Sequence, residues 1–300
     1  MNKRNKATAK EKKRLPIGVS SFKKLRENNY YYIDKSLFIR DVIEASAEAL
    51  LLPRPRRFGK TLNLSMLRYF FEKSEEDRSG LFDGLAIRND KVFSEHQGRY
   101  PVIYLTFKDM KGRNWEDLYE GLCKLISEEI ERHVKVLNSN CLSVTDRNYF
   151  ESLIEIKGSR RSFEDSLRIL CGVLNRCHNK RVVILIDEYD TPLHAGYANG
   201  YYKEVIDFMR NFLSGGFKDN EHLFKGVITG ILRVAKESIF SGLNNLGVYT
   251  LLQEEFNTAF GFTEDEVKSL LNDCNIIERY DEVSLWYNGY LFSEEIIYNP

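Results

Sequence analysis

The sequence predicts an α/β fold in which helices cover both faces of a doubly wound, parallel sheet of five strands. Five short apolar segments alternate with segments of helical periodicity, the pattern of repeated strand–helix–strand units. The strongest strand, residues 181–187, has an apolar, β-branched core and ends at an acidic pair. At 300 residues with 43% apolar composition, the chain is long enough to bury a core on each face of such a sheet.

The first 15 residues form a basic segment that differs from the rest of the chain. They hold seven Lys or Arg and one Glu, a net charge of +6. Since the totals are 44 and 44, residues 16–300 carry 37 basic groups against 43 acidic ones. We predict that residues 1–15 are a disordered, solubilising tail, with nucleic-acid contact as the alternative. The segment has no apolar run, so it is not a secretory signal.

No part of the sequence indicates a membrane or an oxidising compartment. The chain has no apolar run near the ~20 residues that a membrane-spanning helix needs. Its five cysteines are scattered and form no C-x-x-C pair, so we expect reduced, mostly buried thiols in a cytoplasmic chain. Cys177-His178 stands alone near the end of a predicted helix, and we interpret it as structural rather than as a metal site.

The predicted sheet domain extends over residues 16–256. We expect its strands at residues 49–52, 101–107, 181–187, 223–229 and 246–252. Apolar residues at helical spacing predict helices near residues 37–43, 62–71, 115–136, 162–177 and 201–213. Ser162, with Asp165 three residues later, is the predicted N-cap of the fourth helix. Residues 137–160 are expected to be polar and irregular.

After residue 256 the pattern changes to short helices. We expect them near residues 264–271 and 281–287, and Thr263 with Glu266 has the capping-box pattern at the start of the first. Residues 257–300 are therefore predicted to form a small C-terminal helical lid. Because the sequence stops in mid-pattern, we expect this lid to be truncated.

Residues 50–67, LLLPRPRRFGKTLNLSML, have the pattern of a strand, a turn and a helix, with Gly59-Lys60-Thr61 at the turn. This is the ending of a phosphate-binding loop. Backbone N–H groups at a helix start bind the anion, the lysine neutralises phosphate charge, and the threonine hydroxyl coordinates Mg²⁺. The general motif has a glycine five residues before Gly59, where this chain has Arg54. Taken alone, the segment leaves a working site, a decayed site and an accidental match open.

A second motif supplies the acidic groups that such a site needs. Asp187 and Glu188 come directly after the strongest strand. Asp187 would hold the magnesium ion and Glu188 would orient the attacking water, whereas the alternative is that the pair caps the next turn. The joint occurrence of both motifs favours a site for ATP with Mg²⁺. The chain has no N-K-x-D-like guanine-reading motif, which favours adenine.

The fourth strand adds a third element. It ends at Thr229, and Arg233 follows four residues later. In ATPases with an additional strand at this place, a polar residue at the strand tip lies near the γ-phosphate. Thr229 would then sense that phosphate, and Arg233 would stabilise charge developing on it. The alternatives are an ordinary strand-end hydroxyl and a surface salt bridge.

Six segments, in this order, resemble the predicted AAA-ATPase (AAA-ATPase-like) family, P-loop NTPases of the additional-strand class. They are PIGVSSFKKL, YYYIDKS, RPRRFGKTL, PVIYLTFKD, ILIDEYDTPL and TGILRVAKESIFSGLNNL. The resemblance extends from about residue 15 to the end and implies a P-loop NTPase sheet. It also makes R-P-R-R-F-G-K-[ST] the family's own form of the loop, so Arg54 is not a local lesion. A loop without its first glycine is expected to be stiffer and to turn ATP over slowly.

The resemblance also implies site residues. It assigns Lys60 and Thr61 to phosphate and magnesium, Asp187 to magnesium and Glu188 to water activation. Together with the loop and the fourth strand, this gives our full set of candidates. For nucleotide binding they are Arg56, Arg57, Phe58, Gly59, Lys60, Thr61 and Leu62, for the metal Thr61 and Asp187, and for catalysis Glu188, Thr229 and Arg233. One of Arg56 and Arg57 is expected at phosphate and the other at the surface or a subunit interface, which keeps an oligomer open. Asp190 either supports the site from behind or caps the turn before Pro192.

Fuller members of that family continue into a nuclease-like domain of the PD-(D/E)xK type, which implies such a domain after this chain. Glu155-Ile156-Lys157 has the E-x-K ending of a nuclease motif but lies in a polar insertion, so we assign it no such activity. Our leading hypothesis is an ATP-binding protein that hydrolyses ATP slowly, as a switch or motor for an attached or partner domain. The alternatives are a non-enzymatic regulatory module that binds nucleotide and a scaffold that does not.

Overall fold

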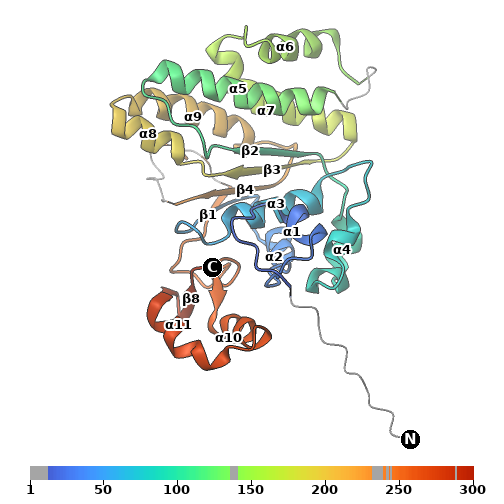
Figure 1. The fold of residues 1–300 in the computed structure, drawn as a ribbon. Helices are drawn as coiled ribbons and strands as arrows, with labels where there is room; N and C mark the ends of the chain where they lie inside the picture. Colours follow the sequence, from blue (N-terminus) through green and yellow to red (C-terminus); the bar gives the residue numbers. More distant parts are fainter. Residues whose placement is uncertain (1–12, 136–140, 232–238, 241–242, 244, 288) are drawn as a thin grey trace, which may run out of the picture.

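A large α/β domain and a small C-terminal module make up the chain (Figure 1). The computed structural model describes residues 13–135, 141–231, 239–240, 243, 245–287 and 289–300. In Figure 1 the module, coloured orange to red, lies at the end of the α/β domain that carries β1, away from α5 and α7.

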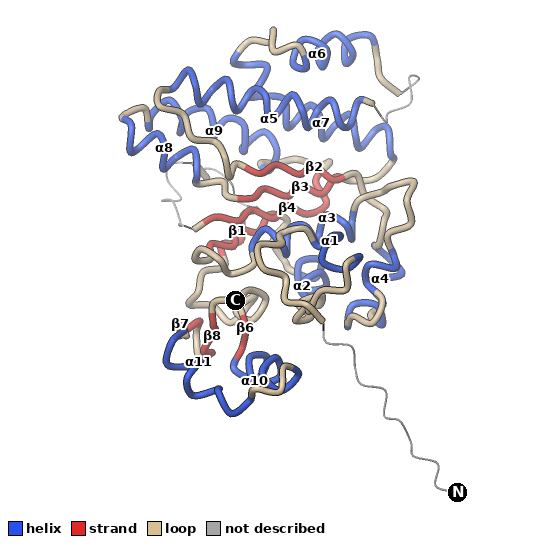
Figure 2. The backbone as a smooth tube through the Cα atoms, viewed as in Figure 1, coloured by secondary structure: helices blue, strands red, loops and turns tan. Residues whose placement is uncertain are grey.

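The centre of the α/β domain is a five-stranded sheet whose strand pairs are all parallel, in the order β2-β3-β4-β1-β5 (Figure 2). Its strands are β1 (Ala49–Pro53), β2 (Val102–Thr106), β3 (Val182–Asp187), β4 (Leu223–Gly230) and β5 (Leu246–Val248). The predicted five-stranded parallel sheet is confirmed. Because β4 lies between β1 and β3, with Leu52 beside Thr229, the carboxyl ends of these three strands are neighbours.

Helices cover both faces of the sheet, because alternate residues of a buried strand point to opposite faces. Leu51 and Ile184 belong to the core on one face, and Leu50 and Val183 to the core on the other. The first face is covered by α5 (Trp115–Val134), α7 (Arg160–His178), α8 (Thr191–Asn199) and α9 (Tyr202–Phe217), and α6 (Val144–Ile154) packs on the outside of α5 (Figure 1). The second is covered by α1 (Phe22–Glu27), α2 (Phe38–Glu44), α3 (Lys60–Phe71), α4 (Lys91–His96) and the 3-10 turns Ser79–Phe82 and Ala86–Asn89. Within the described ranges, no helix is long and apolar enough to cross a lipid bilayer.

Helix α6 corrects the prediction that residues 137–160 are irregular. Ser143 and Asp146 form a capping box at its start. Phe150 and Leu153, three residues apart, are fully buried on the side that packs against α5. The helix is short and carries few apolar residues, so its stability comes from this tertiary packing and not from its own pattern.

Helix α7 begins three residues before the predicted position. Its N-cap is Ser159, whose side chain accepts a hydrogen bond from the Ser162 N–H. Arg160 and Arg161, in the first turn, each donate to an acidic side chain four residues later. These pairs support one more helical turn than the apolar pattern indicated.

The C-terminal module contains a small sheet in addition to the predicted helices. Its helical elements are α10 (Glu264–Asp273), the 3-10 turn Ile277–Arg279 and α11 (Tyr280–Tyr287). The strands β6 (Phe262–Thr263), β7 (Tyr290–Phe292) and β8 (Glu295–Tyr298) pair antiparallel in the order β6-β8-β7. The capping box of Thr263 and Glu266 is present as predicted. The strands were not predicted because two to four residues are too few to show a period.

The cysteines are not all reduced, contrary to prediction. Cys141 and Cys177 form a disulfide across 36 residues of sequence, with their Cα atoms 5.5 Å apart. The bond joins the segment before α6 to the last turn of α7. Cys123 and Cys171 are buried free thiols, as expected.

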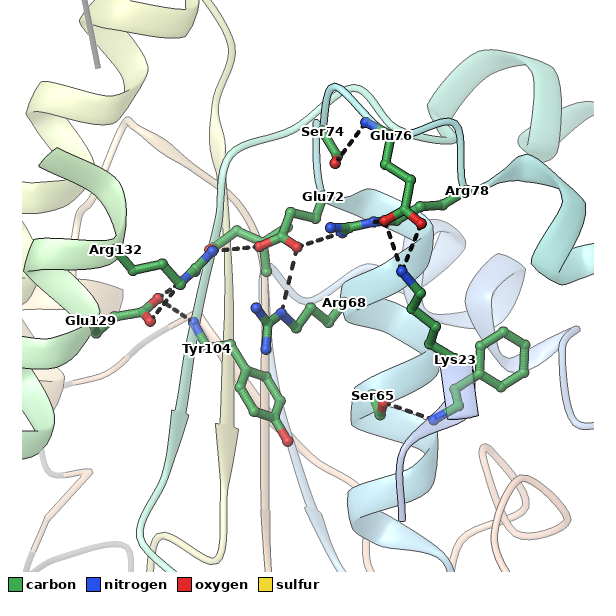
Figure 3. A network of polar contacts seen from close by, with 12 residues as sticks. Lys23, Ser65, Arg68, Glu72, Ser74, Glu76, Arg78, Tyr104, Glu129 and Arg132 are labelled. Atoms are coloured by element: carbon green, nitrogen blue, oxygen red, sulfur yellow. Dashed lines mark hydrogen bonds and ion pairs between the residues drawn. The ribbon is translucent and has the colours of Figure 1, made fainter. Parts of the chain in front are cut away.

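A polar network fixes the C-terminal end of α3 to the edge of the sheet (Figure 3). Glu72, directly after α3, accepts hydrogen bonds from Arg78 and Arg132 at 2.6 Å each. Arg132 also pairs with Glu129 of α5, which accepts from the backbone N–H of Tyr104 in β2. The network holds α3 in place at the end opposite to the predicted phosphate loop.

Candidate nucleotide site

The loop between β1 and α3 contains two residues with left-handed backbone and ends at the start of a helix. Gly59 is the N-cap of α3 and has a φ of 77°, in the left-handed region that favours glycine. Arg57 also has a positive φ, 65°. Since α3 begins at Lys60, the unpaired N–H groups of its first turn lie at the end of this loop.

Lys60 is buried in the loop and held only by neutral acceptors. Its Nζ donates to the carbonyl oxygens of Arg54, at 3.0 Å, and Pro55, at 2.8 Å. Burial lowers the pKa of Lys60, while the charges of the carboxylates at positions 187, 188 and 190 oppose that shift. Among the described residues Lys60 makes no ion pair within 4.0 Å. The ammonium group can therefore exchange two carbonyls for an anion.

Asp187, the last residue of β3, accepts hydrogen bonds from two threonine hydroxyls. Thr61 Oγ1 donates to Oδ2 at 2.6 Å, and Thr229 Oγ1 donates to Oδ1 at 2.7 Å. Asp187 and Thr229 are fully buried. The fold thus brings together three predicted site residues, from α3, β3 and β4, around one carboxylate.

The oxygen atoms of Thr61 and Asp187 fit a magnesium ion. Mg²⁺ prefers oxygen ligands, and in nucleotide sites it takes one or two from the protein and others from phosphates and water. In the part of the chain that the structure describes, no group of three or more His, Cys, Asp or Glu could hold a metal by itself. The donor set therefore suits an ion shared with the phosphates of a nucleotide.

Glu188 lies just beyond the buried strand, in a constrained backbone. Its φ is 53°, a conformation that costs free energy for a residue with a Cβ and is enriched at functional sites. The side chain is half-buried, and Oε2 accepts a hydrogen bond from Thr191 Oγ1 at 3.3 Å. The next residue, Tyr189, donates its N–H to the carbonyl of Thr229 at 3.1 Å. These contacts hold Glu188 at the same sheet edge as Asp187.

Asp190 supports the end of β4 from behind. Its Oδ2 accepts from the backbone N–H of Ile231 at 2.9 Å, and its side chain makes no cap bond to α8. A Cβ on Gly230 would lie 2.7 Å from Asp190 Oδ1, so only glycine allows this close approach. Of the two roles predicted for Asp190, the contacts favour support of the site. Arg233, which follows this strand end, lies outside the described residues.

The other predicted loop residues differ in their surroundings. Arg56 and Arg57 are exposed, and neither forms an ion pair within the described part of the chain. The Phe58 ring is fully buried and stacks on Phe292 of β7, with ring centres 5.4 Å apart. Leu62 is half-buried at the margin of the core on the α3 face. The Phe58 side chain therefore belongs to the contact with the C-terminal module.

The sequence provided no role for Arg54, whose side chain turns away from the loop. It is fully buried, and its guanidinium group donates to the carbonyl oxygens of Tyr249, at 2.8 Å, and Phe256, at 3.0 Å. Both acceptors are backbone atoms of the segment between β5 and the module. No sequence signal marks a backbone acceptor, so this contact could not be predicted.

The chain resembles known proteins over most of its length. Residues 16–240 match the family described as "Predicted AAA-ATPase". The chain is also 32% identical over 292 residues to an Azotobacter chroococcum mcd 1 protein named "Uncharacterized protein in vnfD 5′region", covering 96% of this chain and 51% of that protein. The chain thus spans about half the length of this relative. No solved structure matches the chain. The family supports nucleotide binding in general. The match over residues 16–240 shows that the chain belongs to the predicted AAA-ATPase family.

Proposed function

We propose that this chain binds ATP at the loop between β1 and α3 and hydrolyses it slowly with Mg²⁺. The observation that carries the proposal is the convergence of Thr61 and Thr229 on Asp187. Thr61 and Asp187 are the metal ligands that we propose. Thr61 directly follows Lys60 in the chain and Asp187 directly precedes Glu188, so the proposed cation and base would lie beside them. A site that binds and hydrolyses a nucleoside triphosphate needs these groups at one edge of a sheet.

Binding would begin at the loop and the first turn of α3. The N–H groups there carry partial positive charge and would donate to phosphate oxygens. Lys60 would leave the carbonyls of Arg54 and Pro55, because a hydrogen bond between two charged groups is stronger than one to a neutral acceptor. When bound, Mg²⁺ at Thr61 and Asp187 would neutralise phosphate charge.

For hydrolysis, Glu188 would orient a water molecule and accept its proton. The water oxygen forms a bond to the γ-phosphorus, and the bond from that phosphorus to the bridging oxygen breaks. ADP leaves and inorganic phosphate remains. Thr229 keeps Asp187 oriented throughout, since it donates to the oxygen that Thr61 does not use. Arg54 in place of the first glycine stiffens the loop, which is our reason for expecting slow turnover.

We infer that this cycle serves as a switch or motor for an attached or partner domain. Supporting this, the loop residue Phe58 contacts the C-terminal module directly. The family resemblance implies that the controlled domain is nuclease-like, and its substrate would be nucleic acid.

Calorimetry with MgATP and a phosphate-release assay test the proposal on the parent chain, Glu188→Gln and Lys60→Ala. We expect Glu188→Gln to bind ATP like the parent and to turn it over about 10²-fold more slowly, the usual size of a general-base effect. Equal turnover in the two would remove Glu188 from the mechanism. Binding without release above the Lys60→Ala level would identify a non-enzymatic regulatory module, and no binding at all would leave a scaffold.

A further inference from the structure

Arg54 connects the phosphate loop to the C-terminal module, defined here as residues 262–298, through the linking segment, residues 249–261. Its guanidinium group donates to two carbonyls of the linking segment, those of Tyr249 and Phe256. The same group lies 5.1 Å from the ring centre of Phe260 and 5.8 Å from that of Phe292. One side chain at the first loop position thus contacts the segment and the module together.

The surroundings of Arg54 are unusual for a buried cation. Burial lowers its pKa to about 10, so the group stays protonated at neutral pH. Within the described ranges no carboxylate pairs with it, and its Nε has no hydrogen-bond partner. Carbonyl dipoles and ring faces alone hold the charge, so these hydrogen bonds and cation–π contacts have to offset the lost hydration of the guanidinium group. A glycine at this position would make none of them.

The backbone of the same residue faces the nucleotide site. Its carbonyl oxygen accepts from Lys60 Nζ at 3.0 Å, and its N–H donates to Gly230, directly after Thr229, at 3.0 Å. When Lys60 exchanges the Arg54 carbonyl for another partner, the Arg54 backbone is therefore affected. The side chain of the same residue holds the linking segment.

Two neighbouring hydrogen bonds also join the loop and the start of α3 to the linking segment. The carbonyl of Phe58 accepts from the Gly261 N–H at 3.2 Å. Asn63, in the first turn of α3, donates its side-chain amide to the carbonyl of Ala259 at 2.7 Å. The loop and the linking segment are therefore joined at two further points.

We propose that Arg54 is a positioning residue that transmits nucleotide occupancy from the phosphate loop to the C-terminal module. This rests on the proposed function, because the signal begins when Lys60 leaves the Arg54 and Pro55 carbonyls for phosphate oxygens. The Arg54 backbone then loses a cationic partner and shifts. Its guanidinium group carries the shift to Phe256, Phe260 and Phe292.

Hydrogen exchange of the full chain, with and without saturating MgATP, tests this. In the parent, ATP should slow exchange in the linking segment and the module. Arg54→Met should still bind ATP, because the phosphate contacts come from Lys60 and the backbone. Its ATP-induced protection in the module should fall about tenfold or more, the factor for losing one charged hydrogen bond. Arg54→Lys, which keeps the charge and part of the contacts, should give an intermediate response.

Arg26 provides a matched control. It also donates to two backbone carbonyls, those of Leu81 and Asp83, at a place away from the loop. Arg26→Met should therefore keep the response of the module to ATP. A loss in Arg54→Met that Arg26→Met shares would be general destabilisation and would overturn the proposal.

Four further cases decide whether the coupling exists. A module response in Arg54→Met equal to that of the parent overturns the proposal, and so does a parent that binds ATP without any change in the module. A parent that binds no ATP by calorimetry contradicts the proposed function and the coupling together. If Arg54→Met does not fold, Phe292→Leu removes the ring from the module side of the contact: a lost response supports the coupling, and a retained one overturns it.

Discussion

The hydroxyl of Thr61 lies 2.6 Å from Oδ2 of Asp187, so the first turn of α3 is joined to the last residue of β3. The two residues are 126 positions apart in the sequence. The other carboxylate oxygen accepts from Thr229 of β4, the strand between β1 and β3. A single buried carboxylate therefore sets the spacing of three elements at the edge where the nucleotide is proposed to bind.

Thr229→Val should destabilise the protein, because it leaves Asp187 Oδ1 without its donor in a buried place. An unsatisfied buried acceptor costs about 1–3 kcal/mol in the free energy of unfolding. Thr229→Ser keeps the hydroxyl and should stay closer to the parent. Urea unfolding of the three proteins measures the difference. A valine variant as stable as the serine variant would show that the hydroxyl does not support Asp187.

Lys60→Ala should weaken ATP binding about 10–150-fold, which corresponds to one charged hydrogen bond of about 1.5–3 kcal/mol. Lys225 provides the control, since its Nζ also donates to two backbone carbonyls, those of Ala45 and Ala47, at the other end of the sheet. Lys225→Ala should therefore leave ATP affinity unchanged. Titration calorimetry, with circular dichroism to check the fold, gives both values. Equal affinities for the two variants would disprove the site.

Glu129→Gln should reduce the loss of stability in acid. Burial raises the pKa of Glu129, but hydrogen bonds and charge from His133 and Arg132 outweigh it and lower the pKa to about 2 from 4.5. Figure 3 shows the pair of Glu129 with Arg132. Since the folded pKa is the lower one, the stabilisation is present above pH 4.5 and is lost as the pH falls toward about 2. Urea unfolding measures the free energy of unfolding at about pH 5 and about pH 3. This free energy should fall less between the two pH values in the variant than in the parent.

Glu131→Gln is the control for that experiment. Glu131 lies on the same helix, but its pair with Lys135 is exposed, and exposed pairs contribute about 0–1 kcal/mol. The acid-induced loss of stability in Glu131→Gln should match that of the parent. If Glu129→Gln behaves in the same way, the buried network does not set the acid stability.

Gly216→Ala should destabilise the protein although alanine favours helices. An added Cβ would lie 2.4 Å from Leu167 Cδ2, where α9 crosses α7. Gly215 is the matched control in the same helix, because its Cβ would meet nothing closer than 3.4 Å, at Arg168 Cβ. Gly215→Ala should gain up to about 1 kcal/mol from helix propensity. The midpoint of thermal unfolding should therefore fall in Gly216→Ala and rise in Gly215→Ala. A shift in the same direction in both variants would contradict the close approach of α9 and α7.

Local patterns were enough to predict the sheet and where its motifs lie. The five strands are short apolar runs, and the helices between them repeat apolar residues at helical spacing, so each shows its period within a few residues. Gly59-Lys60-Thr61 lies in the turn after β1, where α3 begins, and the acidic pair Asp187-Glu188 stands at the end of β3. Parallel strands end at one edge of a sheet, so the sequence alone implied that these residues would meet there.

The tertiary structure decided what depends on distant partners. Helix α6 exists because Phe150 and Leu153 have α5 to pack against, and the Cys141–Cys177 bond because α7 ends beside the segment before α6. Arg54 reaches carbonyls 195 and 202 residues away. Every residue carries a backbone carbonyl, so such an acceptor leaves no mark in the sequence, and only the folded chain shows which of them meets the guanidinium group.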